Sequence, residues 1–277
     1  MTRRKFVYSF LGASAIAASY PCYLEPRWLA VTRTKVALQR ARLAGPIRIL
    51  HLSDLHYSWA VPLGFIDSAV TLGLCEKPDV ICVTGDFITG TQDLSDGAYA
   101  HTLSRLSRFA PTFAVLGNHD GGPWAQGAGG YSDHSAVDRL LNRSQVQLLH
   151  NTSSTFRIRG ANLTFVGVGD LWSDEIDSQT AFSRIDRNRP VVLLSHNPDS
   201  KDVLEREPWD LMLSGHTHGG QVIIPFEGPR FAPVVDKRYV AGLAPWGARQ
   251  IYVSRGVGNL GGVRFQCRPE VSLLEIS

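Results

Sequence analysis

The chain has 277 residues, of which 44% are hydrophobic, and it carries 28 Lys and Arg against 25 Asp and Glu. A chain of this length and composition can build one large core or two small ones, and the alternation of strands with helical stretches favours one α/β domain. Three of the basic residues lie at Arg3–Lys5, and residues 1–18 contain no acidic side chain, so the rest of the chain has 25 residues of each sign. The excess of positive charge is therefore confined to the start of the chain, and no nucleic-acid partner is expected.

Residues 1–18 have the pattern of a secretory signal. Arg3-Arg4-Lys5 precedes an apolar run, Phe6–Ala18, which contains the small-residue cleavage candidate Ala15-Ile16-Ala17. The paired arginines followed by Phe resemble a twin-arginine signal, so the twin-arginine export machinery is an expected partner. The run is shorter than the ~20 residues of a membrane span. We expect a periplasmic or otherwise exported protein, associated with the membrane surface if the signal stays uncleaved.

Residues 19–46 are an expected irregular lead-in with one strand, and residues 47–277 are the expected folded domain. In the first half of that domain, short apolar runs alternate with helical stretches, which is the order of neighbouring parallel strands joined by crossover helices. Continuous apolar runs are typical of strands buried on both faces. The expected strands are Leu29–Leu38, Ile47–Ser53, Asp79–Thr84 and Thr112–Leu116, and the expected helices are Pro62–Lys77 and Leu94–Phe109.

The second half has shorter elements and more turns. A glycine-rich loop, Gly121–Gly130, precedes a helix expected near residues 132–142, and two further helical stretches are expected at Thr180–Arg187 and near Lys201–Glu205. The expected strands are Val146–Leu149, Ser154–Ile158, Leu163–Val168, Val191–Leu194 and Leu211–Leu213, followed by a β-rich tail with Val222–Ile224, Tyr239–Val240, Ile251–Val253 and Val271–Ile276. This order favours an α/β (α+β) fold, a two-layer β sandwich of mixed sheets flanked by helices, over a purely doubly wound sheet.

The four cysteines are not expected to carry chemistry. Cys75 and Cys82 flank a helix-to-strand junction, Cys267 lies near the end of the chain, and no Cys-x-x-Cys pair is present. Spacing alone cannot define a disulfide, so buried reduced thiols are favoured over a bridge. They are also not expected to bind a metal.

Five short polar segments each begin where an apolar run stops. Two of them repeat one spacing, because Asp54 and His56 are two residues apart, as are His216 and His218, and side chains at that spacing in extended chain point the same way. Loops at the carboxyl ends of strands are where α/β folds assemble their sites. Carboxylate, amide and imidazole ligands without thiolate suit Mn, Fe or Zn over Ca or Mg. The segments are Asp54-Leu55-His56, Gly85-Asp86, Gly117-Asn118-His119-Asp120, Ser195-His196-Asn197 and Gly215-His216-Thr217-His218.

Each segment alone is a weak signal, since Gly-Asp is a common turn and a lone Asp-x-His is more often an ordinary loop. Five of the nine histidines fall inside the segments, however, which favours a metal site. Trp124 and Tyr131 either flank a leaving group or belong to a plain connection, and core packing is favoured for Trp172 over stacking on a ligand. Solvated or ion-paired charges are favoured for Arg255 and Arg264 over contacts with phosphate.

The ordered set of segments resembles the calcineurin-like metallophosphoesterase superfamily, from about Arg48 to Gln221. The stretches Pro208–Gln221, Ser254–Gly258 and Arg268–Glu270 are similar to a branch of twin-arginine-exported phosphodiesterases. The resemblance implies a metallophosphoesterase domain over residues 47–277. That branch is in turn similar to enzymes that split UDP-diacylglucosamine in lipid A synthesis.

The resemblance also implies a role for each residue of the segments. Two divalent metal ions are expected, with His119 as the general acid that protonates the leaving oxygen and Asp120 as a residue that orients His119. One ion is expected on Asp54, His56 and His218, the other on Asn118, His196 and His216, with Asp86 as the bridge.

The expected function is a metal-dependent phosphodiesterase that hydrolyses phosphate diesters by in-line attack of a metal-bridging hydroxide. The expected substrate is a small phosphate ester or a lipid-linked one. Two alternatives remain open: a UDP-2,3-diacylglucosamine-type pyrophosphatase of lipid A metabolism, and a metal-binding or partner-binding protein without turnover.

Overall fold

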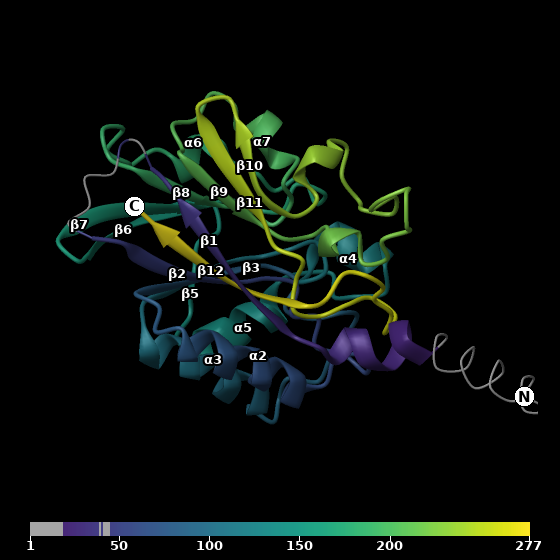
Figure 1. The fold of residues 1–277 in the computed structure, drawn as a ribbon. Helices are drawn as coiled ribbons and strands as arrows, with labels where there is room; N and C mark the ends of the chain where they lie inside the picture. Colours follow the sequence, from purple (N-terminus) through teal and green to yellow (C-terminus); the bar gives the residue numbers. More distant parts are fainter. Residues whose placement is uncertain (1–18, 39, 41–44) are drawn as a thin grey trace, which may run out of the picture.

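The computed structural model describes residues 19–38, 40 and 45–277, so the predicted signal at residues 1–18 lies outside the described residues. Two six-stranded sheets form the centre of the molecule, and helices lie on their outer faces (Figure 1). The expected sandwich of mixed sheets flanked by helices is therefore confirmed.

The first sheet contains the strands of the first half of the chain and the last strand of the second half. Its order is β1-β12-β2-β3-β4-β5. β2, β3 and β4 are parallel neighbours, as the alternation of strands and helices predicts, and the short β5 continues the parallel order, whereas β12 is antiparallel to β2. The lead-in contributes the edge strand β1, which pairs in parallel with β12. The bounds are β1 Ala30–Val36, β2 Ile47–Leu52, β3 Val80–Thr84, β4 Thr112–Val115, β5 Gln147–Leu148 and β12 Glu270–Ile276.

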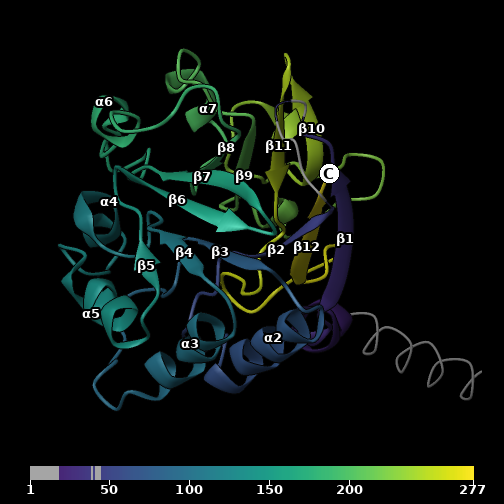
Figure 2. The same cartoon turned by 90° about the vertical axis from the view of Figure 1, so that its left-hand side faces the viewer.

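Three helices cover the outer face of the first sheet (Figure 2). They are α2 (Leu63–Cys75), α3 (Ala98–Phe109) and α5 (Ser135–Arg143). Their apolar sides bury one hydrophobic cluster against the sheet, with Ile66, Leu103 and Leu140 among its members. Helix α3 begins four residues after the predicted Leu94, because Gly97 precedes it in the left-handed conformation with φ 73°.

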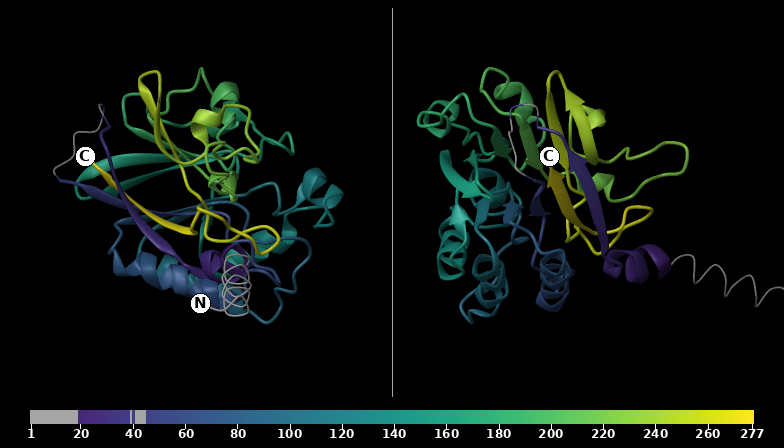
Figure 3. Two further views of the ribbon diagram at one scale, coloured as in Figure 1. Left: turned by 45° about the vertical axis from the view of Figure 1, so that its right-hand side comes forward. Right: turned by 60° about the vertical axis from the view of Figure 1, so that its left-hand side comes forward.

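The second sheet has the order β10-β11-β9-β8-β7-β6. β11, β9, β8 and β7 run parallel, and antiparallel pairs close both edges. Short helices α6 (Ser178–Ala181) and α7 (Ser200–Val203) lie on its outer side, opposite the blue helices α2 and α3 in the right-hand view of Figure 3. The bounds are β6 Thr152–Ile158, β7 Ala161–Gly167, β8 Val191–Leu194, β9 Leu211–Ser214, β10 Gly242–Trp246 and β11 Arg249–Val253.

The main core lies between the two sheets. Phe113 from β4 stacks on Phe165 from β7, with ring centroids 4.8 Å apart, and both side chains are buried. Aliphatic residues from the facing strands fill the same cluster, including Ile49, Val192 and Leu213. Burial of this apolar surface is the main force that holds the sheets together.

Several predicted elements differ in the structure. The glycine-rich loop contains a short helix, α4 (Gly122–Gly127), and Tyr239 ends a 3-10 turn at Lys237–Tyr239 instead of opening a strand. At Val222–Ile224 only isolated bridges form, and the helix expected at Thr180–Arg187 is the single turn α6. Strand β10 was not predicted, because its residues are only partly buried and contain a proline.

All four cysteines are free thiols, but only Cys82 and Cys267 are buried, whereas Cys22 and Cys75 are exposed. Among the described residues, no helix has the length and apolar character needed to cross a membrane.

Candidate metal centre and active site

The carboxyl ends of five strands from both sheets meet at one place. β2, β3 and β4 are parallel in the first sheet, and β8 and β9 are parallel in the second. The strands of each group therefore end at the same edge of their sheet. The predicted site residues follow two to four residues after these ends. Asp54 and His56 follow β2, Asp86 follows β3, Asn118 follows β4, His196 follows β8, and His216 and His218 follow β9.

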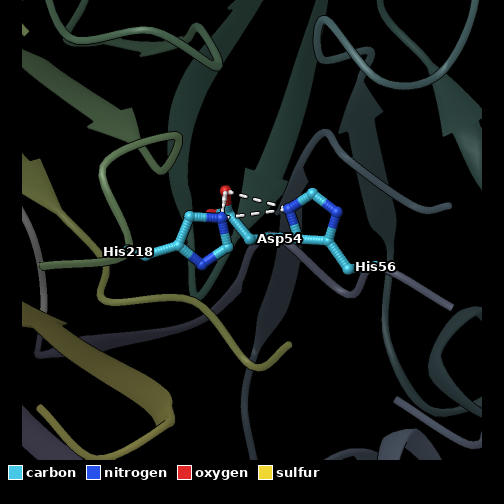
Figure 4. Close-up of side chains that lie close together, drawn as sticks. All are labelled: Asp54, His56 and His218. Carbon is cyan, nitrogen blue, oxygen red and sulfur yellow. Dashed lines mark hydrogen bonds and ion pairs between the residues drawn. The ribbon is translucent and has the colours of Figure 1, made fainter. Parts of the chain in front are cut away.

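Asp54, His56 and His218 form the first ligand set (Figure 4). The Nε2 atoms of His56 and His218 lie 3.0 Å apart, and Asp54 Oδ1 is 3.5 Å from His218 Nε2. Atoms bound at about 2.1 Å to one ion lie roughly 3.0–3.4 Å from one another, so the distance between the two imidazoles fits one ion, and the Asp54 Oδ1 distances of 3.5 Å to His218 and 3.9 Å to His56 are somewhat longer. All three side chains are buried, and their donor atoms face one point.

Asn118, His196 and His216 form the second set. His216 Nδ1 lies 2.9 Å from Asn118 Oδ1 and 3.2 Å from His196 Nε2. These separations match donors around one ion. They indicate that His216 would bind the ion through Nδ1 and His196 through Nε2.

Asp86 lies between the two sets. Its Oδ2 atom is 3.3 Å from His56 Nε2 in the first set and 3.2 Å from His196 Nε2 in the second. All seven predicted ligands are therefore in one buried group whose oxygen and nitrogen donors fit a metal site. Removing so many polar atoms from water without a cation would be costly.

Two histidines are held in the tautomer that a metal requires. His196 Nδ1 lies 2.7 Å from the carbonyl oxygen of Thr84, which can only accept, so Nδ1 carries a proton and Nε2 is the nitrogen that faces the site. His56 Nδ1 lies 2.7 Å from Thr89 Oγ1, and donation to that hydroxyl frees its Nε2 in the same way. Such outer partners orient imidazole ligands in metal centres.

The backbone of the site is strained. Five of the seven ligands are non-glycine residues with positive φ, which costs each of them about 1–3 kcal/mol. Such strain concentrates where the surroundings force a functional geometry on the chain. The angles are 52° for Asp54, 48° for His56, 55° for Asp86, 67° for His216 and 51° for His218.

Glycines make room for the two carboxylates. A Cβ on Gly215 would overlap Ser53 Oγ and Asp54 Oδ2, and one on Gly117 would overlap Asp86 Oδ1. Only glycine therefore allows the ligand loops to approach this closely.

Burial and charge act on the carboxylates in opposite directions. Burial raises the pKa of Asp54. Burial would also raise the pKa of Asp86, but the charges of its histidine neighbours, His196 first, hold it well below its usual range. The Asp86 carboxylate is thus ionised at neutral pH, as a bridging ligand must be.

Asp120 binds backbone groups of two ligand loops. Its Oδ2 accepts hydrogen bonds from the backbone N–H groups of Asp86 and Gly117, both at 2.8 Å, and its Oδ1 accepts one from Phe87 at 2.6 Å. Among the described residues, no hydrogen bond joins Asp120 to the imidazole of His119, so the predicted orienting role receives no support from these contacts. Asp120 ties the loop after β3 to the loop after β4, which places Asp86 beside Asn118.

His119 lies beside the ligands, as predicted for a residue that meets the substrate. Its backbone N–H donates to Asp86 Oδ1 at 2.9 Å, and its half-buried ring lies edge-on to Trp124, with centroids 4.7 Å apart. Burial lowers the pKa of His119 to about 4, so its imidazole is neutral at pH 7 in the free enzyme. It can donate a hydrogen bond in that state, and a nearby phosphoryl charge would raise its pKa.

Arg264 belongs to the support of the site, which the sequence did not indicate. It is fully buried, and its guanidinium donates to the carbonyl oxygens of Arg255 at 2.7 Å and Cys267 at 3.0 Å. It also donates to the carbonyl oxygen of Gly258, whose own N–H donates to the carbonyl oxygen of Asp54 at 2.6 Å. The expected solvated or ion-paired state is wrong for Arg264 and correct for Arg255, which pairs with Glu270 at 3.2 Å.

A cleft of about 340 Å³ opens over the ligands. Trp172, for which core packing was favoured, is 40% exposed and lines the cleft, where its ring lies edge-on to His216 with centroids 4.2 Å apart. Trp124 also lines it, whereas Tyr131 lies away from it and donates to the carbonyl oxygen of Gln92. The other lining residues are Asp86, Asn118, His119, His216, Thr217, His218, Gly220, Gln221, Val222, Phe231, Pro233 and Leu260.

Comparison with known proteins supports the resemblance of the motifs. Phosphodiesterase YaeI of Escherichia coli K12 is 42% identical, over 100% of this chain and 99% of that protein. The uncharacterized metallophosphoesterase YkuE of Bacillus subtilis is 30% identical over 100% and 98%. UDP-2,3-diacylglucosamine pyrophosphatase LpxG of Chlamydia trachomatis is 28% identical over 96% and 94%.

Among solved structures, Haemophilus influenzae NAD nucleotidase NadN aligns with a TM-score of 0.49 and 15% identity, over 77% of this chain and 45% of that chain. The family model for calcineurin-like phosphoesterases matches residues 47–220, which contain all seven predicted ligands and His119. The chain therefore belongs to the calcineurin-like phosphoesterase family.

Proposed function

We propose that this protein is a metal-dependent phosphodiesterase that uses two divalent cations, Mn, Fe or Zn. The observation that carries the proposal is the position of one carboxylate oxygen, Asp86 Oδ2, within 3.3 Å of a donor in each of two separate ligand sets. One shared oxygen between two sets of three donors is the arrangement that a dinuclear centre requires. The full-length similarity to phosphodiesterase YaeI supports the choice of reaction.

The residues divide between the two cations as the distances suggest. One cation would be held by Asp54, His56 and His218 and the other by Asn118, His196 and His216, with Asp86 shared. When bound, the cations supply Lewis-acid activation of the attacking water and neutralise charge on the phosphoryl oxygens.

Residues other than the ligands position the reacting groups. His119 lines the cleft next to Asn118, where its ring would donate a hydrogen bond or a proton to the leaving oxygen. Asp120 fixes the relative position of the loops that carry Asp86 and Asn118. The aromatic side of the cleft excludes water from one side of the reacting group.

The test is hydrolysis of bis(4-nitrophenyl) phosphate by purified full-length protein loaded separately with Mn, Fe and Zn. Asp86→Ala and the isosteric Asp86→Asn should both abolish turnover, because neither supplies a charged bridging oxygen. Asp202→Asn is the matched control, since that carboxylate lies on α7 with 67% of its side chain exposed. Full activity in Asp86→Asn, or no hydrolysis with any of the three metals, would contradict the proposal.

A pyrophosphatase acting on UDP-2,3-diacylglucosamine is the second candidate, because LpxG matches this chain over nearly its whole length. Release of UMP from that substrate, at a rate above that for simple diesters, would favour this reaction. A protein without turnover is the remaining alternative, and only a metal-loaded protein that hydrolyses no ester in a broad panel would support it.

We also propose that the protein acts outside the cytoplasm after export by the twin-arginine machinery. The support is the Arg3-Arg4 pair ahead of the apolar run. Replacing both arginines by lysine should leave the protein in the cytoplasmic fraction, as judged by fractionation and immunoblotting. An unchanged distribution would count against the proposal.

A further inference from the structure

We propose that the cleft over the metal centre selects singly charged phosphodiesters whose ester group is aromatic or aliphatic, and that Trp124 and Trp172 bind this group. The inference rests on the proposed function and names the class of substrate for the same site. Its basis is a cleft that combines apolar walls with a lack of lysine and arginine among the described residues that line it.

One wall consists of rings that begin directly at the ligands. Trp172 lies edge-on to His216, and Trp124 lies edge-on to His119, with centroids 4.2 Å and 4.7 Å apart. The two tryptophans contact each other, with centroids 5.4 Å apart. A group attached to a phosphorus atom beside His119 and His216 therefore meets tryptophan rings as its first contact. Large rigid rings bind apolar groups with little loss of conformational entropy.

Two further apolar side chains line the cleft, Phe231 and Leu260, and hydrogen bonds hold the second of them in place. Phe231 is 66% exposed and Leu260 is 38% exposed, which leaves apolar surface open to water beside the ligands. Gln221 fixes Leu260 by a reciprocal pair of hydrogen bonds: its Oε1 accepts from the backbone N–H at 2.9 Å, and its Nε2 donates to the carbonyl oxygen at 2.8 Å. Apolar surface left open to water beside a site is typical of a binding surface.

The charge of the cleft limits what it can bind. Among the described residues that line it, none is lysine or arginine. Arg230, which precedes Phe231, is paired with Glu227 at 2.8 Å, and Arg255 is paired with Glu270. Phosphate groups in proteins are commonly bound by Arg or Lys. Here only the cations would balance the negative charge, which favours a diester with one charge over a dianionic monoester or a diphosphate.

The test uses a series of alkyl 4-nitrophenyl phosphates in which the leaving group is constant and the other ester group grows from methyl to butyl to hexyl. In the wild-type enzyme, kcat/KM should rise by about three- to fourfold per methylene until the cleft is filled. Trp172→Ala should flatten this rise and act mainly on KM, and Trp172→Phe should restore part of it. Phe226→Ala is the control, because Phe226 is fully exposed and does not line the cleft.

A second variant tests the charge argument by gain of function. Leu260→Lys places a cation on the cleft wall, so the ratio of kcat/KM for 4-nitrophenyl phosphate to that for the hexyl diester should rise about tenfold or more. A flat alkyl series in an active wild-type enzyme, or an unchanged ratio in folded Leu260→Lys, would overturn this inference and leave the phosphodiesterase proposal intact. Absence of hydrolysis for every diester would instead overturn the proposed function.

Discussion

The substitution Gly215→Ala tests how the fold positions the first ligand set. Gly215 follows the end of β9 and directly precedes His216, whose backbone N–H donates to Asp54 Oδ1 at 2.9 Å. A Cβ at residue 215 would overlap Ser53 Oγ and Asp54 Oδ2. The new methyl group therefore acts on the Asp54 carboxylate, although no ligand has been replaced.

The expected loss follows from the size of the overlap. Relieving it requires the carboxylate to move by about 1 Å, and a misplacement of that size costs on the order of 100-fold in rate. The structural cost of the extra methyl group is about 1–3 kcal/mol, as for other overpacked sites, so the protein should still fold.

The assay compares Gly215→Ala with Gly64→Ala. Gly64 lies in α2, where an added Cβ meets no atom within 4 Å, so the same chemical change should leave kcat and metal content unaltered. We expect Gly215→Ala to lose about 100-fold in kcat for bis(4-nitrophenyl) phosphate and to retain less metal by elemental analysis. Activity and metal content both equal to those of Gly64→Ala would refute the assigned position of Asp54.

Three further predictions concern residues around the centre. His119→Ala should slow esters with poor leaving groups more than 4-nitrophenyl esters, and an equal loss for both would exclude a role in protonating the leaving oxygen. Asp120→Asn should lower the thermal unfolding midpoint by on the order of 5 °C and reduce turnover, since an amide cannot accept all of the backbone hydrogen bonds. The third concerns His134, whose hydrogen bond to Glu175 raises its pKa. Burial would raise the Glu175 pKa, but His134 lowers it overall. The pair therefore stabilises the fold above the ordinary Glu pKa and below the ordinary His pKa, and this stability is lost as pH rises through the raised His134 value. His134→Gln should reduce the unfolding midpoint near pH 5.5 and much less at pH 8.5; an equal effect at both would contradict the assignment.

The strands that are buried along their whole length are the elements that the sequence predicts well. Strands such as Val80–Thr84 and Val191–Leu194 are buried along their whole length, so their continuous apolar runs indicate strands. The ligands follow shortly after the ends of these strands. Strand Gly242–Trp246 and helix Gly122–Gly127 were missed for physical reasons. The first is half exposed and contains Pro245, and the second contains two glycines and follows a third. Tertiary contacts, more than local preference, hold both in place.

The supporting residues of the site depend on contacts across the fold. The backbone groups bound by Asp120 include Asp86 and Phe87, which lie 34 and 33 residues away in the chain. Arg264 lies in the connection between β11 and β12, and besides its bonds within that connection it donates to the carbonyl oxygen of His218, 46 residues away, at 3.4 Å. A single sequence carries no local pattern for such bonds, whereas ligand types and spacing are local and could be predicted.

The most direct test of the dinuclear centre is anomalous diffraction from crystals of the full chain grown with Mn, measured on both sides of the absorption edge. The account predicts two anomalous peaks, one within the donors of Asp54, His56 and His218 and one within those of Asn118, His196 and His216, with Asp86 between them. A single peak, or peaks that lie away from these residues at saturating Mn, would contradict it.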